Sequence, residues 1–157
     1  MNVTVVKAVP AALAPRFLRG VLAAAAEEPG PAARLRGAGE RPALAVKVTG
    51  DRELRRLNRR FLGEDRPTDV LAFPSGELGS GYLGDLALSW PAVRRQAAEA
   101  GHGVEVEAAL LVVHGLLHLL GWDHANAAEE ADMTAVTLAC LRRAGVEPAA
   151  GRLQPAT

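Results

Sequence analysis

Apolar residues recur with two different spacings along this chain, and these spacings predict a mixture of strands and helices. Strands are expected where apolar side chains alternate, or run together briefly, between turn residues. The segments with that pattern are residues 3–9, 43–49, 68–73 and 82–88. Helices are expected where apolar side chains repeat every three or four residues. They cover residues 15–28, 51–62, 90–100, 104–120 and 127–144.

The order of these elements predicts one α+β domain. The connections are short, residues 32–42 and 77–81 are expected to be a loop and a turn, and no internal repeat or linker divides the chain. The chain has 157 residues, of which 49% are apolar, and this suffices for one hydrophobic core. We therefore expect a mixed four-stranded sheet packed with about five helices over residues 1–146. Residues 147–157 contain two prolines and are expected to be a frayed tail.

The helix expected over residues 104–120 is almost wholly apolar, so it should be buried. It nevertheless carries His114 and His118, which are four residues apart and so project from one face. Gly121 can end the helix in a left-handed turn that brings His124 back toward them. Burying two imidazoles without partners costs roughly 1–3 kcal/mol each, a cost that a shared metal ion removes.

Three histidines around one point predict a metal site with a vacant fourth position, at the end of a buried helix. Imidazole nitrogens without a thiolate favour zinc, although nickel and copper accept the same ligands. We expect one Zn²⁺ per chain, bound by His114, His118 and His124. Asp123 is the expected hydrogen-bond partner of one of these rings, and its alternative role is to form the turn after the helix. The fourth histidine, His102, is expected to lie in an exposed loop.

Composition limits the partners and the cellular compartment that we expect for this protein. The formal net charge is zero, so any nucleic acid must be bound by a local patch, and no DNA binding is predicted. The single cysteine, Cys140, excludes an internal disulfide and a cysteine-based zinc knuckle. No signal peptide is recognised, and the longest apolar run, residues 108–120, is too short to span a bilayer. The sequence therefore favours a cytoplasmic protein without a membrane partner.

A basic stripe provides such a local patch on the helix expected over residues 51–62. Its members recur with helical spacing and are Arg52, Arg55, Arg56, Arg59 and Arg60. Leu54, Leu57 and Phe61 lie on the opposite side and are expected to anchor the helix to the core. The stripe could hold nucleic-acid phosphates through bidentate contacts, and the alternative is a solvated helix face. Arg59, at the centre of the stripe, and Arg66 are the arginines expected to reach an RNA-binding cleft.

The histidine motif is similar to motifs of known families. The spacing His-x3-His-x2-Gly-x2-His is similar to the zinc helix of metzincin proteases, whose glutamate after the first histidine is replaced here by Gly115. The whole segment His114-Gly-Leu-Leu-His-Leu-Leu-Gly-Trp-Asp-His124 resembles the signature of the YbeY family of bacterial endoribonucleases. Further stretches resemble that family in the same order: Leu57-Asn58, residues 66–74 (RPTDVLAFP), Leu83-Gly84-Asp85 and Met133.

The resemblance implies a zinc-dependent endoribonuclease that acts on single-stranded RNA. It also implies a role in the maturation of the 16S rRNA 3′ end and in ribosome quality control, with the small ribosomal subunit and its proteins as partners. It carries zinc ligation onto His114, His118 and His124. Two positions depart from the family pattern: Leu62 stands where the family has an arginine tied to activity, and Ala72 where it has a serine.

These features suggest a mechanism in which single-stranded RNA lies along an arginine-lined groove next to the zinc. Zinc-activated water, or the ribose 2′-hydroxyl, would attack phosphorus while an arginine such as Arg59 stabilises the charge. Asp85 is the candidate general base if its strand ends near the metal. Two other functions remain open. One is a non-catalytic, zinc-stabilised ribosome assembly factor that binds rRNA or a ribosomal protein. The other is a metalloprotease, which Gly115 disfavours because no glutamate is there to accept a proton.

Overall fold

Four strands form one twisted sheet in the computed structural model, which describes residues 1–65, 68–76 and 80–153. The strands are β1 (Asn2–Lys7), β2 (Ala43–Thr49), β3 (Val70–Pro74) and β4 (Tyr82–Ser89). Their order across the sheet is β1-β2-β4-β3. The β1–β2 and β2–β4 pairs are parallel, whereas the β3–β4 pair is antiparallel. The predicted mixed four-stranded sheet is confirmed, with β3 as an edge strand.

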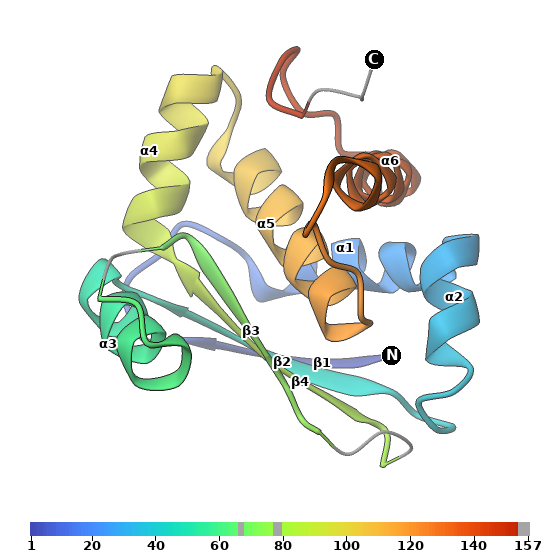
Figure 1. Cartoon of the computed structure of the whole chain (residues 1–157). Helices are drawn as coiled ribbons and strands as arrows, with labels where there is room; N and C mark the ends of the chain where they lie inside the picture. Colours follow the sequence, from blue (N-terminus) through green and yellow to red (C-terminus); the bar gives the residue numbers. More distant parts are fainter. Residues whose placement is uncertain (66–67, 77–79, 154–157) are drawn as a thin grey trace.

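Six helices surround this sheet in the described part of the chain. They are α1 (Pro15–Glu27), α2 (Pro29–Leu35), α3 (Asp51–Leu62), α4 (Trp90–Ala100), α5 (Val104–Leu119) and α6 (Ala127–Arg143). Figure 1 shows α1 and α5 on one side of the sheet, with α6 beyond them. In the same view α3 lies at the left end of the sheet. α4 starts where β4 ends and packs along α5. The single α+β domain expected from the sequence is confirmed.

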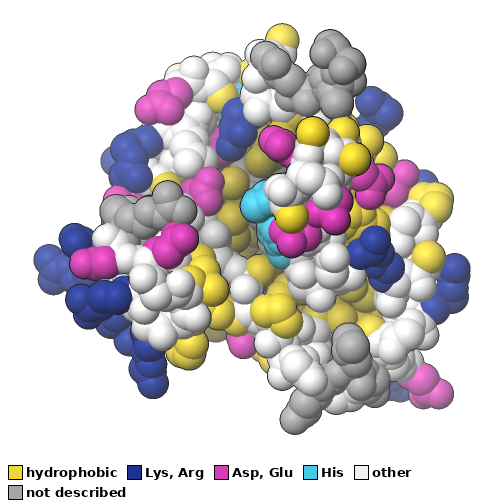
Figure 2. Space-filling model, viewed as in Figure 1, with side chains coloured by type: hydrophobic (Ala, Val, Ile, Leu, Met, Phe, Trp, Pro, Cys, Tyr) yellow, Lys and Arg dark blue, Asp and Glu magenta, His cyan; other side chains and the backbone are white. Residues whose placement is uncertain are grey.

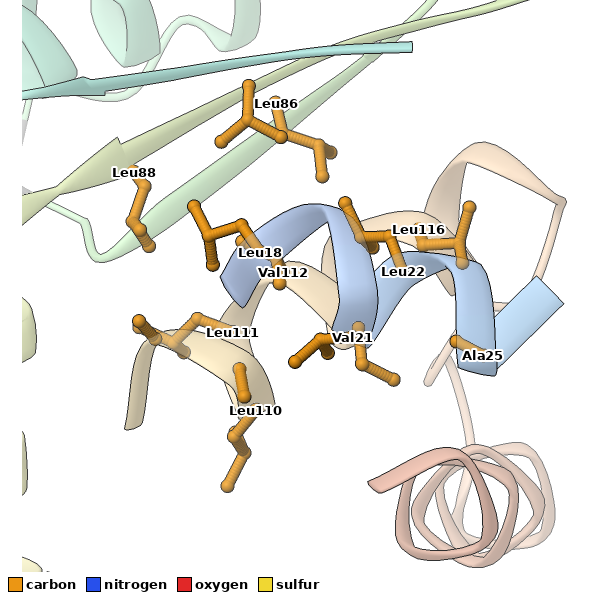
Figure 3. Packing of buried hydrophobic residues seen from close by; sticks show 14 of the residues in the cluster. Leu18, Val21, Leu22, Ala25, Leu86, Leu88, Leu110, Leu111, Val112 and Leu116 are labelled. Atoms are coloured by element: carbon orange, nitrogen blue, oxygen red, sulfur yellow. The ribbon is translucent and has the colours of Figure 1, made fainter. Parts of the chain in front are cut away.

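The main core lies between the sheet and the helices α1 and α5. Strand β2 turns Leu44, Val46 and Val48 inward at every second position, as its alternating pattern requires. Figure 3 shows aliphatic side chains from α1, α5 and β4 that pack in this core. They are Leu18, Val21 and Leu22 from α1, Leu110, Leu111, Val112 and Leu116 from α5, and Leu86 and Leu88 from β4. α5 is therefore a central helix, buried along nearly its whole length.

Gly115 lets α5 approach the sheet closely. A Cβ atom at this position would lie 2.7 Å from Cδ2 of Leu86 on β4, closer than real side chains come. Position 115 therefore faces the core, and His114 beside it points about 100° away around the helix. A larger residue at this position would require Leu86 to move.

A smaller cluster attaches α3 to the other face of the sheet. It joins Leu54 of α3 to Leu71 and Ala87, and Leu57 is half-buried beside it. The prediction that Phe61 anchors this helix to the core is wrong, because its side chain is 57% exposed. Its ring makes an edge contact with Phe73, at 5.3 Å between centroids, and the Arg60 guanidinium lies over it at 5.2 Å.

Helix α2 corrects the expected loop over residues 32–42. The Pro29-Gly30-Pro31 sequence suggested a stop, but the prolines stand in the first turn of α2, where a missing N–H costs nothing. The described residues consequently contain six helices rather than about five. Residues 77–79 of the expected turn lie outside the described residues.

The C-terminal segment also departs from the expected frayed tail in the part that is described. Val146 is buried, and Leu153 packs against the main core. Arg152 forms an ion pair with Glu107 of α5. Residues 147–153 are therefore attached to the domain, and residues 154–157 lie outside the described residues.

No single helix among the described residues is both long and apolar enough to cross a membrane. Only α4 and α5 together would reach that length and composition, and the chain bends by 115° between them.

Candidate metal centre

The end of α5 brings the three predicted histidines together. Gly121 has a φ of 97°, which is the left-handed conformation expected of it. The N–H of Gly121 donates to the carbonyl of His118 at 3.0 Å, and the N–H of Trp122 to that of Leu117 at 2.9 Å. These bonds turn the chain back, and His124 reaches the face that carries His114 and His118. One nitrogen from each ring can be chosen so that all three lie within 4.8 Å of one another.

Trp122 fixes this turn to two other helices. Its indole N–H donates to Asp132 of α6 at 3.1 Å. The guanidinium of Arg34 from α2 stacks over its ring at 3.4 Å and donates to the carbonyl of Leu120 at 3.1 Å. The segment before His124 is thus held by contacts with α2 and α6 as well as by its own hydrogen bonds.

The three rings fit a metal ion by distance and by protonation state. The Nε2 atoms of His114 and His118 are 3.0 Å apart, close to the separation of about 3.3 Å that two nitrogens have around tetrahedral zinc. Burial is the main cause that lowers the pKa of His114 to about 4, and the charge of His118 acts in the same direction. Burial also lowers the pKa of His118. Neutral imidazoles offer the lone pairs that a metal requires. The three histidines could therefore hold a metal ion, with the exposed side of His124 open to solvent.

Figure 2 shows where this cluster reaches the surface. The histidine side chains lie near the centre of the visible face and border a hollow in it. Arginine and lysine side chains gather at the left edge of the same view, over α3. The two groups are separate on this face of the molecule.

Asp123 contacts the backbone rather than a histidine ring. Its Oδ1 accepts a hydrogen bond from the N–H of His124 at 2.8 Å. The distance from the same oxygen to Nδ1 of His124 is 3.8 Å, which is too long for a hydrogen bond. This geometry corresponds to the turn-forming alternative.

Asp69 is an acidic group near His114 to which sequence reasoning gave no role. Its charge acts on His114 and opposes the lowering of that pKa by burial. Its carboxylate accepts from the N–H of Val70 at 2.7 Å and from the amide of Gln96 at 3.2 Å. The sequence could have pointed to Asp69, because this residue lies in the Pro-Thr-Asp-Val segment that resembles the family pattern.

Asp85 is not brought to the histidines. Successive residues of β4 point to opposite faces of the sheet, and Leu86 packs in the main core against α5. Asp85 shares the other face with Ala87, which packs with α3. The hydroxyl of Tyr82 donates a hydrogen bond to Asp85, and burial together with this bond raises the pKa of Tyr82 to about 12.

The basic stripe lies on α3, across the sheet from α5. All five of its arginines, Arg52, Arg55, Arg56, Arg59 and Arg60, are exposed. Arg55 pairs with Asp65 at 2.8 Å, and Arg56 lies 3.7 Å from Glu53. The structure therefore does not place Arg59 against the histidines. Leu62, where the resemblance implied an arginine, is 56% exposed, and Arg66 lies outside the described residues.

His102 corrects another expectation, because its side chain is buried rather than exposed in a loop. Its Nε2 lies 2.8 Å from Glu107, and its Nδ1 accepts from the N–H of Ala149 at 2.9 Å. Glu107, fully buried on α5, also binds Arg152. The sequence could have predicted a buried partner such as His102, because Glu107 lies within an apolar helix and a buried carboxylate requires partners.

Comparisons with known proteins agree with this architecture. The family model described as endoribonuclease YbeY matches residues 12–145. An endoribonuclease YbeY of Aquifex aeolicus is 49% identical over 89 residues, which cover 55% of this chain and 59% of that protein. One of Roseiflexus sp. is 47% identical over 113 residues, covering 66% and 71% of the two chains.

A solved structure supports the fold independently. The solution structure of TM1509 from Thermotoga maritima superposes with a TM-score of 0.60. The sequences are 24% identical, and the match covers 90% of this chain and 88% of the other. Together with the family model, which spans most of the chain, these matches show that the chain belongs to the endoribonuclease YbeY family.

Proposed function

We propose that this protein is a zinc-dependent endoribonuclease that cleaves single-stranded RNA. Its proposed role is the maturation of the 16S rRNA 3′ end and ribosome quality control in the cytoplasm, with the small ribosomal subunit and its proteins as partners. The observation that carries the proposal is the convergence of His114, His118 and His124 in a chain of this family. The endoribonuclease names of the relatives support the reaction class.

The three histidines would hold the zinc ion, and each has a separate structural reason for its position. His114 and His118 are fixed by the rigid central helix α5, whereas His124 depends on the turn anchored by Trp122. When bound, zinc would act as a Lewis acid toward a phosphoryl oxygen and make a water molecule more acidic. The exposed side of His124 leaves room for RNA to approach.

The acidic group of this site is Asp69 rather than Asp85. Asp69 is the described carboxylate whose charge acts on His114, and its two oxygens are oriented by the backbone of Val70 and by Gln96. We propose that Asp69 accepts hydrogen bonds from donor groups that come close to the histidines, and so orients these groups. Two existing hydrogen bonds hold its oxygens in place for this role.

RNA phosphates would be bound by the basic stripe on α3, with Arg59 at its centre and Arg66 after it. Strand β3 is the edge strand between the face covered by α5 and the face covered by α3. An RNA strand that crosses this edge would reach both the stripe and the histidines. Such contacts to phosphates give affinity that falls with salt and tolerates many sequences.

The direct test is zinc analysis beside RNA cleavage for the wild-type protein and the His114→Ala variant. We expect about one zinc per wild-type chain, and a loss of both zinc and cleavage in the variant. The matched control is Arg16→Ala, on the exposed side of α1, which should keep both properties. Full zinc content with unchanged cleavage in His114→Ala would contradict the assignment of this ligand.

A non-catalytic ribosome assembly factor is the second candidate. The exposed Leu62, in place of an arginine, is the observation that favours it. Zinc-loaded protein that binds rRNA but shows no cleavage would support this candidate. A metalloprotease is disfavoured further, because a glutamate at position 115 would collide with Leu86.

A further inference from the structure

An aromatic side chain is exposed in the last turn of α3. The side chain of Phe61 is 57% exposed, and that of the next residue, Leu62, is 56% exposed. Single exposed apolar residues are common in proteins, so the surroundings of this ring decide whether it has a use.

Two contacts hold the ring of Phe61 in a defined place. The residue comes four positions after Leu57, so it projects from the side of α3 that packs on the sheet. Its ring meets that of Phe73 on β3 at 5.3 Å between centroids, with 64° between the ring planes. The guanidinium of Arg60 lies 5.2 Å from its centroid. The ring is therefore ordered before a partner arrives, which lowers the entropy that binding costs.

Positive charge surrounds the exposed ring. Phe61 directly follows the basic stripe, and its neighbours Arg59 and Arg60 are exposed and form no ion pair within the described residues. A purely apolar partner would have to bury these charges without compensation, at a large cost. A partner that carries phosphates would pair with them instead. The charge of this surface therefore favours an anionic ligand that also has a flat apolar face.

An unpaired base of RNA matches both features. Its face stacks on an aromatic ring whatever its identity, and a nearby arginine adds a cation–π contribution. The phosphates on either side of the base bind the arginines of the stripe. A base within a duplex is already paired and stacked, so it cannot be placed on the ring.

The ring also lies at the edge that the RNA is proposed to cross. Its contact Phe73 belongs to the edge strand β3, which packs against α5, the helix of His114 and His118. In Figure 2, hydrophobic side chains lie between the arginines over α3 and the hollow beside the histidines.

We propose that Phe61 is a stacking platform for one unpaired base of the RNA, between the basic stripe and the histidines. Phe73 and Arg60 hold the ring in place for this contact. The platform rests on the proposed function and deepens it. Phosphate contacts alone bind single and double strands, whereas a ring that requires an unpaired base selects single-stranded RNA.

The test is a binding comparison with the Phe61→Leu variant, whose side chain stays apolar but has no aromatic face. Fluorescence anisotropy measures the Kd of a single-stranded RNA oligonucleotide of fixed mixed sequence. In a matched series each nucleotide in turn is abasic, which keeps the phosphate and the ribose and removes only the base. The control is Val6→Ala, which changes an exposed apolar residue of β1, at the opposite edge of the sheet.

For the wild type and the control, we expect one abasic position to lower the affinity roughly ten-fold, within the range that one stacked base contributes. Phe61→Leu should bind the parent RNA roughly ten-fold more weakly and should be insensitive at that position. The slope of log Kd against log salt should stay unchanged in this variant, because the arginines and their phosphate contacts remain.

A second variant, Phe61→Trp, reports stacking directly. The two native tryptophans, Trp90 and Trp122, are buried, so the added indole is the exposed one. This variant should keep the wild-type affinity. Its emission should be quenched by the parent RNA and less by the RNA that is abasic at the sensitive position.

Three results would overturn the platform. They are a wild type insensitive to every abasic position, a Phe61→Leu variant that binds the parent RNA as tightly as wild type, and one that keeps the ten-fold sensitivity. The second result would assign the exposed ring to a protein partner instead. Any of them alongside RNA cleavage by the wild type leaves the proposed endoribonuclease function intact. A wild type that neither binds nor cleaves any RNA would refute that function itself.

Discussion

The buried pair between Arg152 and Glu107 makes a quantitative prediction about stability. Glu107 is fully buried, and burial alone would raise its pKa, but hydrogen bonds from Arg152 and His102 outweigh this and lower it. In the Arg152→Met variant the carboxylate keeps only His102. Removing one partner of a buried ion pair costs about 3–5 kcal/mol. Since the Arg152 side chain is 24% exposed, we expect the lower end, about 3 kcal/mol.

Urea unfolding followed by circular dichroism at pH 7 measures this loss. A domain of this size loses about 2–4 °C in Tm per kcal/mol, so thermal unfolding should show a fall of about 6–12 °C. The surface-pair control is Arg143→Met. Arg143 binds Glu28 at 2.7 Å with its side chain 42% exposed, and its loss should cost less than about 1 kcal/mol.

A double variant separates the ion pair from simple packing. Glu107→Gln combined with Arg152→Met leaves no buried charge, and it should recover most of the stability lost in the single variant. Two results would refute the argument from an uncompensated buried carboxylate. One is a free energy of unfolding of Arg152→Met within about 0.5 kcal/mol of the wild-type value. The other is a double variant that is no more stable than the single variant.

Three further predictions concern Glu107, Gly115 and Arg59. The lowered pKa of Glu107 gives stability that is fully present above its unfolded value of 4.5 and is lost as pH falls through the lower folded value, so urea midpoints below pH 4.5 should fall more steeply for wild type than for Glu107→Gln. Gly115→Glu should destabilise the fold by at least about 1–3 kcal/mol through collision with Leu86 and create no peptidase activity, and a stable variant with activity toward a peptide library would contradict the packing described for α5. Arg59→Glu should weaken RNA binding and lower the slope of log Kd against log salt by about 1 or more, whereas an unchanged slope would assign the stripe to solvent alone.

The histidine cluster was predictable because it depends on local geometry. The spacing of His114 and His118 follows from the helical period, and the turn at Gly121 needs only the conformational freedom of glycine. Fold class was predictable for a similar reason, since the alternation in the strands and the helical spacing are both local patterns.

Features that depend on distant partners were not predictable. His102 is buried because Glu107 and Ala149 surround it, and the second of these is 47 residues away. Asp85 resembled a candidate for the site until the sheet register placed it on the face of α3. In the same way, nothing within α3 indicated which face of the sheet would carry its arginines.

The anchoring of Trp122 has a consequence for the order in which the protein matures. Its ring meets Arg34 from the first quarter of the chain and Asp132 from the beginning of α6. Both contacts hold the turn that precedes His124, so we expect the three histidines to converge in a nascent chain only after α6 has left the ribosome. If the proposed zinc binds here, we expect it to be taken up late in biosynthesis, and a chain arrested during translation before Asp132 should lack the complete metal centre.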